Sequence, residues 1–170
     1  MFCKPLQQII TDCSNLVELN LSDCSLTASS LFAISESLKE SKKISNINFS
    51  LNQIGGMTKE NQPDVATVAG EKMTWWREAE LKNKECVQKF VENIESIIRT
   101  NTQLFHLNLE GMQLKNHILK LGDAIRESKS LHAVHLGSNQ SSFHAQLYVC
   151  SKLGINLHNN RLQKEFSRKQ

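Results

Sequence analysis

Apolar residues recur with the same spacing in four stretches of the chain. Each stretch carries apolar residues at its first, fourth and sixth positions, and three of them also at the eleventh; the stretches are 16–26, 44–54, 104–114 and 131–141. The fourth and sixth positions lie two residues apart, so their side chains point to the same face of a strand. The pattern predicts four short strands, near residues 18–22, 46–50, 106–110 and 133–137.

A helical pattern precedes each predicted strand. Apolar or cysteine residues stand thirteen, ten and six positions before the first residue of every stretch: Cys3, Leu6 and Ile10; Leu31, Ile34 and Leu38; Val91, Ile94 and Ile98; Ile118, Leu121 and Ile125. Gaps of three and four place each trio on one face of a helix. Each helix with the strand that follows it forms one repeat, and all four repeats keep the same register. A last helix, 143–153, is predicted with one apolar face formed by Phe143, Leu147, Cys150 and Leu153.

The repeat length and the motif resemble a known family. From Leu16 to Ile44 is 28 residues, and from Leu104 to Leu131 is 27. Together with the run Leu-Ser-Asp-Cys-Ser-Leu at 21–26, this resembles the ribonuclease-inhibitor-like class of leucine-rich repeats. The resemblance implies an α/β solenoid, with a short parallel sheet on the concave side and helices on the convex side. We expect this domain to span residues 1–153 and to be followed by a basic tail, 154–170.

The ninth position of each stretch favours a side chain that can satisfy backbone groups as the chain leaves the strand. Cys24, Asn52 and Asn139 fit this role, whereas Met112 does not, so its turn should be capped differently or be looser. The sequence holds five cysteines, and Cys3 and Cys24 fall on positions predicted to be buried. We expect reduced core thiols in a cytoplasmic protein rather than disulfides.

The third repeat is preceded by an insert at residues 55–86. The interval from Ile44 to Leu104 is 60 residues, roughly twice the length of one repeat. One interpretation is a degenerate repeat that keeps Val65 and Val68. The favoured one is a loop over 55–70, followed by a long helix from about Glu71 to Arg99, which would be roughly 40 Å long.

Trp75 and Trp76 lie in the part of this helix that should project beyond the other helices. Either they pack against the convex helices or the loop, or they form an exposed anchor for another protein. Tryptophan is enriched at binding hot spots because it buries much area at small entropic cost.

Strand residues that alternate with the core positions should line the concave face. The candidate partner-binding residues there are Glu18, Asn20, Asn46, Asn48, His106, Asn108, Glu110 and His135. The row formed by Asn20, Asn48 and Asn108 either bonds a partner or forms a ladder of hydrogen bonds across the strands, and the ladder is the favoured interpretation.

Several classes of function are disfavoured by the sequence. Motifs such as G-x-S-x-G or H-E-x-x-H are absent, so we expect neither an enzyme nor a cofactor. His106 and His135 lack a predicted carboxylate or cysteine to complete a metal site. The net charge of +3 is small and scattered, which disfavours nucleic acid. The chain contains no apolar run of membrane-spanning length.

The sequence therefore predicts a non-catalytic protein–protein interaction module that works within a complex of several subunits. Short arrays of the resembled class occur in actin-filament cappers and axonemal proteins, which favours a structural or scaffold subunit of a cytoskeletal or ciliary assembly. The alternative is a regulator or inhibitor of an enzyme or GTPase that acts through the concave face.

Overall fold

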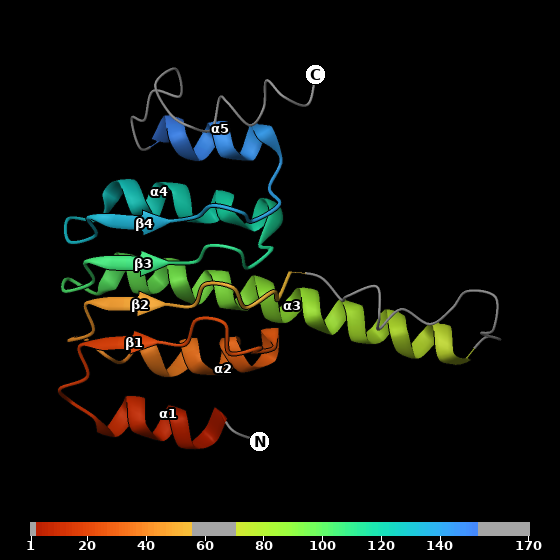
Figure 1. Cartoon of the computed structure of the whole chain (residues 1–170), viewed down its shortest axis with the longest axis horizontal. Coiled ribbons are helices and arrows are strands. Elements are labelled where there is room, and N and C mark those ends of the chain that lie inside the picture. The colour runs from red at the N-terminus through yellow and green to blue at the C-terminus, as the bar shows by residue number, and fades with distance from the viewer. Residues whose placement is uncertain (1–2, 56–70, 153–170) are drawn as a thin grey trace.

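The computed structural model describes residues 3–55 and 71–152, with side chains described from Lys4 in the first segment and from Arg77 in the second. The chain is of the predicted mixed α/β class (Figure 1). Its elements are α1 (Cys3–Asp12), β1 (Glu18–Asn20), α2 (Ala28–Leu38), β2 (Asn46–Asn48), α3 (Glu71–Thr100), β3 (His106–Asn108), the 3-10 turn η2 (Lys115–Ile118), α4 (Leu119–Glu127), β4 (Ala133–His135) and α5 (Phe143–Lys152).

The four described strands form one parallel sheet whose spatial order, β1-β2-β3-β4, is also the order in the chain. The register is the same between all neighbouring strands: Leu19 pairs with Ile47, Ile47 with Leu107, and Leu107 with Val134. These are the fourth positions of the four apolar stretches. The prediction that they lie side by side in adjacent parallel strands is confirmed.

The helices cover one face of this sheet, and each packs against the next helix in the chain, from α1 to α5 (Figure 1). The core between the two layers contains Leu19, Ile47 and Leu107 from the strands. The predicted helix stripes are buried beneath them: Leu31, Ile34 and Leu38; Val91, Ile94 and Ile98; Ile118, Leu121 and Ile125. In α1, Ile10 is buried and Leu6 is half-buried against the core, while the Cys3 side chain lies outside the described part.

Two asparagines at the ninth position, in the second and fourth repeats, each join their repeat to the one before it. Asn52 donates from Nδ2 to the Leu21 carbonyl oxygen (2.8 Å) and accepts at Oδ1 from the Leu26 amide (2.9 Å). Asn139 makes the equivalent pair with Leu109 (2.8 Å) and Leu114 (3.1 Å). Both side chains are buried, so each amide satisfies backbone groups that water cannot reach.

Met112 and Cys24 occupy the same position and behave differently. Met112 is fully buried, and its own carbonyl oxygen accepts from the Ile54 amide (3.1 Å), which replaces the missing side-chain acceptor. Cys24 is exposed, and its thiol donates to the Ser22 carbonyl oxygen (3.3 Å). The prediction of a buried Cys24 is wrong, because in the described chain no strand lies beyond β1 to cover it. Cys13 is also exposed, and Cys86 and Cys150 are half-buried.

The chain leaves every strand through a left-handed residue at the eighth position. Asp23, Leu51, Gly111 and Ser138 have φ angles of 51°, 63°, 70° and 56°. Leu51 is 52% exposed despite its apolar side chain. A β-carbon is disfavoured at positive φ, so this turn stores a small strain at three of the four repeats.

Helix α3 is 30 residues long, and its bounds lie close to those predicted. Its C-terminal half is part of the core through Val87, Phe90, Val91, Ile94, Ile97 and Ile98. Its N-terminal half extends beyond the other helices (Figure 1). Asn83 donates to the Ile54 carbonyl oxygen (3.0 Å) and so fastens the helix to the end of the second repeat. The predicted loop, with Val65 and Val68, lies outside the described residues.

Helix α5 turns a different face to the core from the one predicted. Ala145 and Val149 are buried, whereas Phe143 is 50% exposed and Leu147 and Cys150 are half-buried. Apolar side chains lie all around this helix, so spacing alone does not single out its inner face. Leu153 lies outside the described residues.

Candidate functional site

The face of the sheet turned away from the helices, called here the open face, carries two rows of polar side chains. Parallel pairing in register aligns Glu18, Asn46, His106 and Ala133 in one row, and Asn20, Asn48, Asn108 and His135 in the other. All eight are exposed or half-buried, because successive strand residues point to opposite faces and the buried ones face the helices. The structure thus brings the predicted strand residues together on one surface.

The three asparagines of the second row bond to their own strands and not to one another. Each Oδ1 accepts from the amide two residues on: Asn20 from Ser22 (3.1 Å), Asn48 from Ser50 (3.0 Å) and Asn108 from Glu110 (3.0 Å). The hydroxyls of Ser22 and Ser50 add a second bond of 2.8 Å to the first two of these oxygens. The favoured interpretation of a cross-strand asparagine ladder is therefore wrong. The backbone amide two residues on bonds to each Oδ1 in preference to an asparagine on the next strand, because the turn already holds that amide in place.

These turns use the oxygen of each carboxamide and leave its Nδ2 group available as a donor. Among the described residues, none of the Nδ2 groups of Asn20, Asn48 and Asn108 donates a hydrogen bond. The bonded oxygens fix which end of each amide is the donor. The open face thus presents three oriented donors on three adjacent strands. The Asn-x-Ser spacing shared by Asn20 and Asn48 was the signal of these turns in the sequence.

His106 and His135 meet at the other end of the open face. Their ring centroids are 5.1 Å apart and the ring planes are 80° apart, an edge-to-face contact. Glu110 lies beside β4, where a β-carbon added to Gly137 would be 3.3 Å from Glu110 Oε1. His132 leaves this surface and stacks on Phe105 with centroids 4.8 Å apart. In the described ranges, no group of three or more His, Cys, Asp or Glu residues is arranged to hold a metal ion.

Trp75 and Trp76 belong to the projecting half of α3, but their side chains lie outside the described residues. The two interpretations, inward packing and an exposed anchor, therefore both remain predictions. Leu81, later in the same half of α3, is 64% exposed.

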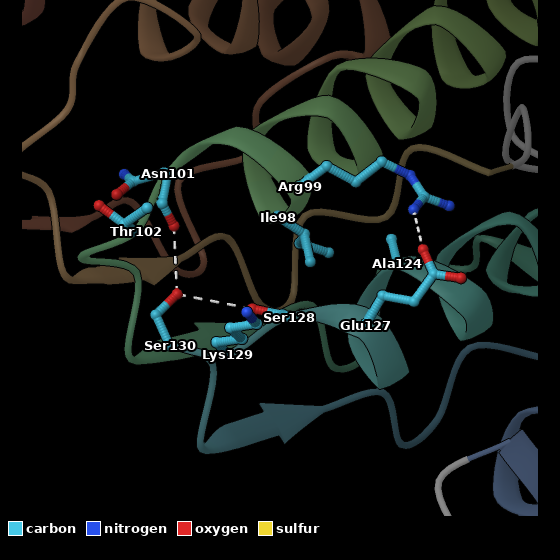
Figure 2. Close-up of a pocket in the computed structure, with 9 residues that line it drawn as sticks. All are labelled: Ile98, Arg99, Asn101, Thr102, Ala124, Glu127, Ser128, Lys129 and Ser130. Atoms are coloured by element: carbon cyan, nitrogen blue, oxygen red, sulfur yellow. Dashed lines mark hydrogen bonds and ion pairs between the residues drawn. The ribbon is translucent and has the colours of Figure 1, made fainter.

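A pocket of about 410 Å³, which the sequence did not indicate, opens where α3 and α4 end (Figure 2). Several of its polar groups already have partners within the chain. Arg99 binds Glu127 and Glu95, the Ser130 hydroxyl donates to the Asn101 carbonyl oxygen (3.1 Å), and the Ser128 hydroxyl accepts from the Leu131 amide (3.2 Å). We assign these contacts a structural role, in joining the third repeat to the fourth.

No protein-family model matches the chain, and no curated protein matches it either. Among solved structures, it is similar to the tropomodulin C-terminal domain of Caenorhabditis elegans, at 12% sequence identity and a TM-score of 0.44, over 96% of this chain and 98% of that one. A similarity of this size says nothing about what this chain binds. None of the described helices is long and apolar enough to cross a membrane.

Proposed function

We propose that the chain is a non-catalytic leucine-rich-repeat module of the ribonuclease-inhibitor-like class that binds another protein through the open face. The observation that carries this proposal is the row of three oriented amide donors with no acceptor among the described residues. Such groups stay exposed at no cost in water and gain hydrogen bonds when a partner covers them.

The rigidity of the surface supports the same proposal. The strands beneath it are fixed by the core, and the asparagine amides are held by their turns. A preordered surface loses little conformational entropy on association, so more of the contact energy appears as affinity. Curved arrays of repeats provide such surfaces in general.

We further propose that the partner belongs to a larger assembly, in which the chain is a structural or scaffold subunit of cytoskeletal or ciliary type in the cytoplasm. The alternative is a regulator or inhibitor of an enzyme or GTPase, acting through the same surface. Sedimentation separates the two: a scaffold subunit pellets with filaments or a large complex, whereas a regulator forms a soluble complex of defined stoichiometry with its target.

Charge reversal on the open face tests the proposed surface. Glu18→Arg with Glu110→Arg changes two exposed carboxylates of this face. Asp12→Arg with Glu40→Arg makes the same change of charge at exposed positions outside the sheet. Proteins captured from cell extract and quantified by mass spectrometry should be lost with the first variant and retained with the second. Equal capture by both variants would exclude the open face.

The projecting half of α3 is a second candidate contact. If Trp75 and Trp76 form an anchor, Trp75→Ala with Trp76→Ala should weaken capture of the same partner by more than tenfold and leave the thermal midpoint within a few degrees. A large fall of the midpoint with capture unchanged would place both tryptophans in the packed structure instead.

A further inference from the structure

We propose that the segment bound by the open face is an α-helix lying across the strands, with a carboxamide side chain, Asn or Gln, once per turn facing Asn20, Asn48 and Asn108. This inference rests on the proposed function and specifies the chemistry of the partner. Its basis is the direction, spacing and electrostatic surroundings of the three amide donors.

The first argument is the direction of the hydrogen bonds. The Oδ1 atoms of Asn20 and Asn48 each accept two hydrogen bonds and that of Asn108 accepts one, whereas none of the three Nδ2 groups has an acceptor among the described residues. The complementary surface must therefore present acceptors in a row. A partner that offers donors at these points would leave both sides unsatisfied, which costs more than a missing bond in solution.

The second argument is the spacing. Adjacent strands are about 4.8 Å apart, so three donors in register span roughly 9.6 Å. Side chains at i, i+4 and i+7 of an α-helix span about 10.5 Å along its axis. Three same-face residues of an extended segment span about 13.6 Å. The mismatch is about 1 Å for the helix and about 4 Å for the extended segment, so a helix reaches the three donors with less adjustment of its side chains.

The third argument is charge, which separates carboxamides from carboxylates as the acceptors. Glu18 lies in the row beside the asparagines, and Glu110 stands two residues after Asn108, just beyond the end of β3. The two rows contain no lysine or arginine, and their other titratable groups are His106 and His135. A helix with a carboxylate once per turn would be repelled by both glutamates, whereas a neutral carboxamide oxygen accepts the same bonds without that cost.

Asparagine-to-aspartate substitutions provide the sharpest test. An aspartate at position 48 keeps an oxygen that accepts from the Ser50 amide, but it removes the donor and puts an acceptor in its place. Asn15→Asp is the matched control. Asn15 lies outside the open face, and its Oδ1 accepts from Lys43 Nζ (3.1 Å), a contact that a carboxylate retains. Both variants add the same charge, and thermal melts verify that both fold.

The probe is a 16-residue peptide of Ala and Lys with Gln at positions 5, 9 and 12, held helical by a staple on its opposite face. It is compared with the same peptide carrying Glu at those three positions, and with an extended Thr-rich peptide carrying Gln at alternate positions. Binding to the full-length chain is followed by nitrogen-15 NMR of the asparagine side-chain amides, which are assigned by their loss in Asn20→Asp, Asn48→Asp and Asn108→Asp.

We expect the helical Gln peptide to shift the side-chain amide signals of the three asparagines, and the other two peptides to bind more weakly. Asn48→Asp should lower the affinity about tenfold, as expected for one lost hydrogen bond, and Asn15→Asp should leave it within about twofold. Stronger binding of the extended or Glu peptide, equal affinities of the two variants, or no shift with the helical peptide at millimolar concentration would each overturn the inference. The capture experiment with Glu18→Arg and Glu110→Arg separates this inference from the proposed function. If that variant loses its partner but the peptides give any of the contrary results, the inference fails and the proposed function stands.

Discussion

Asparagine has two different roles at the ends of the strands, and depth of burial decides which one it takes. Asn52 is buried and uses both ends of its amide on backbone groups of the preceding repeat. Asn48, four residues earlier, is half-buried and uses its oxygen on its own turn while its Nδ2 stays available. The same functional group therefore joins the repeats in one position and leaves a donor on the open face in the other.

Removing the buried amide should cost much stability. Asn52→Ala leaves the Leu21 carbonyl and the Leu26 amide without their partner. We expect a loss of about 3 kcal/mol, because each unsatisfied buried group costs about 1–3 kcal/mol. Cys24→Ala, at the same motif position but exposed, should change stability by less than about 0.5 kcal/mol. Urea denaturation of both variants measures the difference, and similar midpoints would contradict the assigned role of Asn52.

Two glycines should respond to alanine in opposite directions. Gly111 has φ +70°, and an added β-carbon would lie 2.9 Å from Leu51 Cδ2, so Gly111→Ala should cost about 1–2 kcal/mol. Gly122 lies inside α4, and an added β-carbon would be 3.5 Å from Tyr148 Cε1, an ordinary contact. Gly122→Ala should gain up to about 1 kcal/mol from helix propensity. Thermal melts test both signs, and destabilisation by Gly122→Ala would show that α5 does not accommodate the methyl group.

At the scale of elements, the sequence specified the parts of the fold that many residues determine together. Twelve helix positions, three before each strand motif, keep the same spacing from that motif in all four repeats. The order of the strands in the sheet and the buried faces of the helices could therefore be predicted. Single positions were harder. The burial of Cys24 depends on whether a neighbouring strand covers it, and the inner face of α5 is ambiguous because apolar side chains surround the helix.

The candidate site was predictable in location but not in chemistry. Period-two alternation placed Asn48, Asn108 and His135 on one face. The bonding of each asparagine depends on the turn that follows its strand, which brings the amide two residues on within reach of Oδ1. The sequence interpretation favoured hydrogen bonds among the asparagines across the strands, whereas each oxygen bonds within its own turn and each Nδ2 is without an acceptor among the described residues.

Helix α3 should consist of two halves of unequal stability. Leu81, in the projecting half, is 64% exposed, whereas Glu92 is an exposed residue in the half that packs on the core. Leu81→Pro should reduce helical circular dichroism and leave the thermal midpoint within a few degrees, since local fraying does not open the core. Glu92→Pro breaks the helix among buried turns and should cost about 3 kcal/mol or more. Equal midpoints for both variants would show that the projecting half is also required for the fold.

At the scale of the whole molecule, ion pairs link successive helices along the outside. Glu92 binds Lys120 (2.7 Å), Glu127 binds Arg99, and Asp123 binds Lys152 (3.1 Å). The hydrogen bond from Lys120 lowers the pKa of Glu92, that from Arg99 lowers the pKa of Glu127, and that from Lys152 lowers the pKa of Asp123. Each carboxyl thus binds protons less readily in the folded chain than in the unfolded one.

Acid should therefore weaken the fold. A lowered carboxyl pKa contributes stability that is present above the ordinary value and is lost as the pH falls through the folded value. We expect the thermal midpoint to fall between about pH 5 and pH 3. Glu92→Gln with Glu127→Gln should flatten this fall, whereas Glu40→Gln, which changes an exposed carboxylate without an ion pair in the described part of the chain, should not. If the thermal midpoint of the double variant fell with pH as that of the wild type does, these two carboxylates would not be the source of the loss of stability in acid.

The packing of each helix against the next in line has a consequence under mechanical load. With a stretching force applied between α1 and α5, none of the described strands or helices would have to be sheared past a distant one, because each is held mainly by its immediate neighbours. Extension in an optical trap should then proceed in small steps that peel units from the ends, at forces well below those of folds whose terminal strands are clamped together. Such a chain would yield gradually within a stressed assembly and recover its shape when the tension is released.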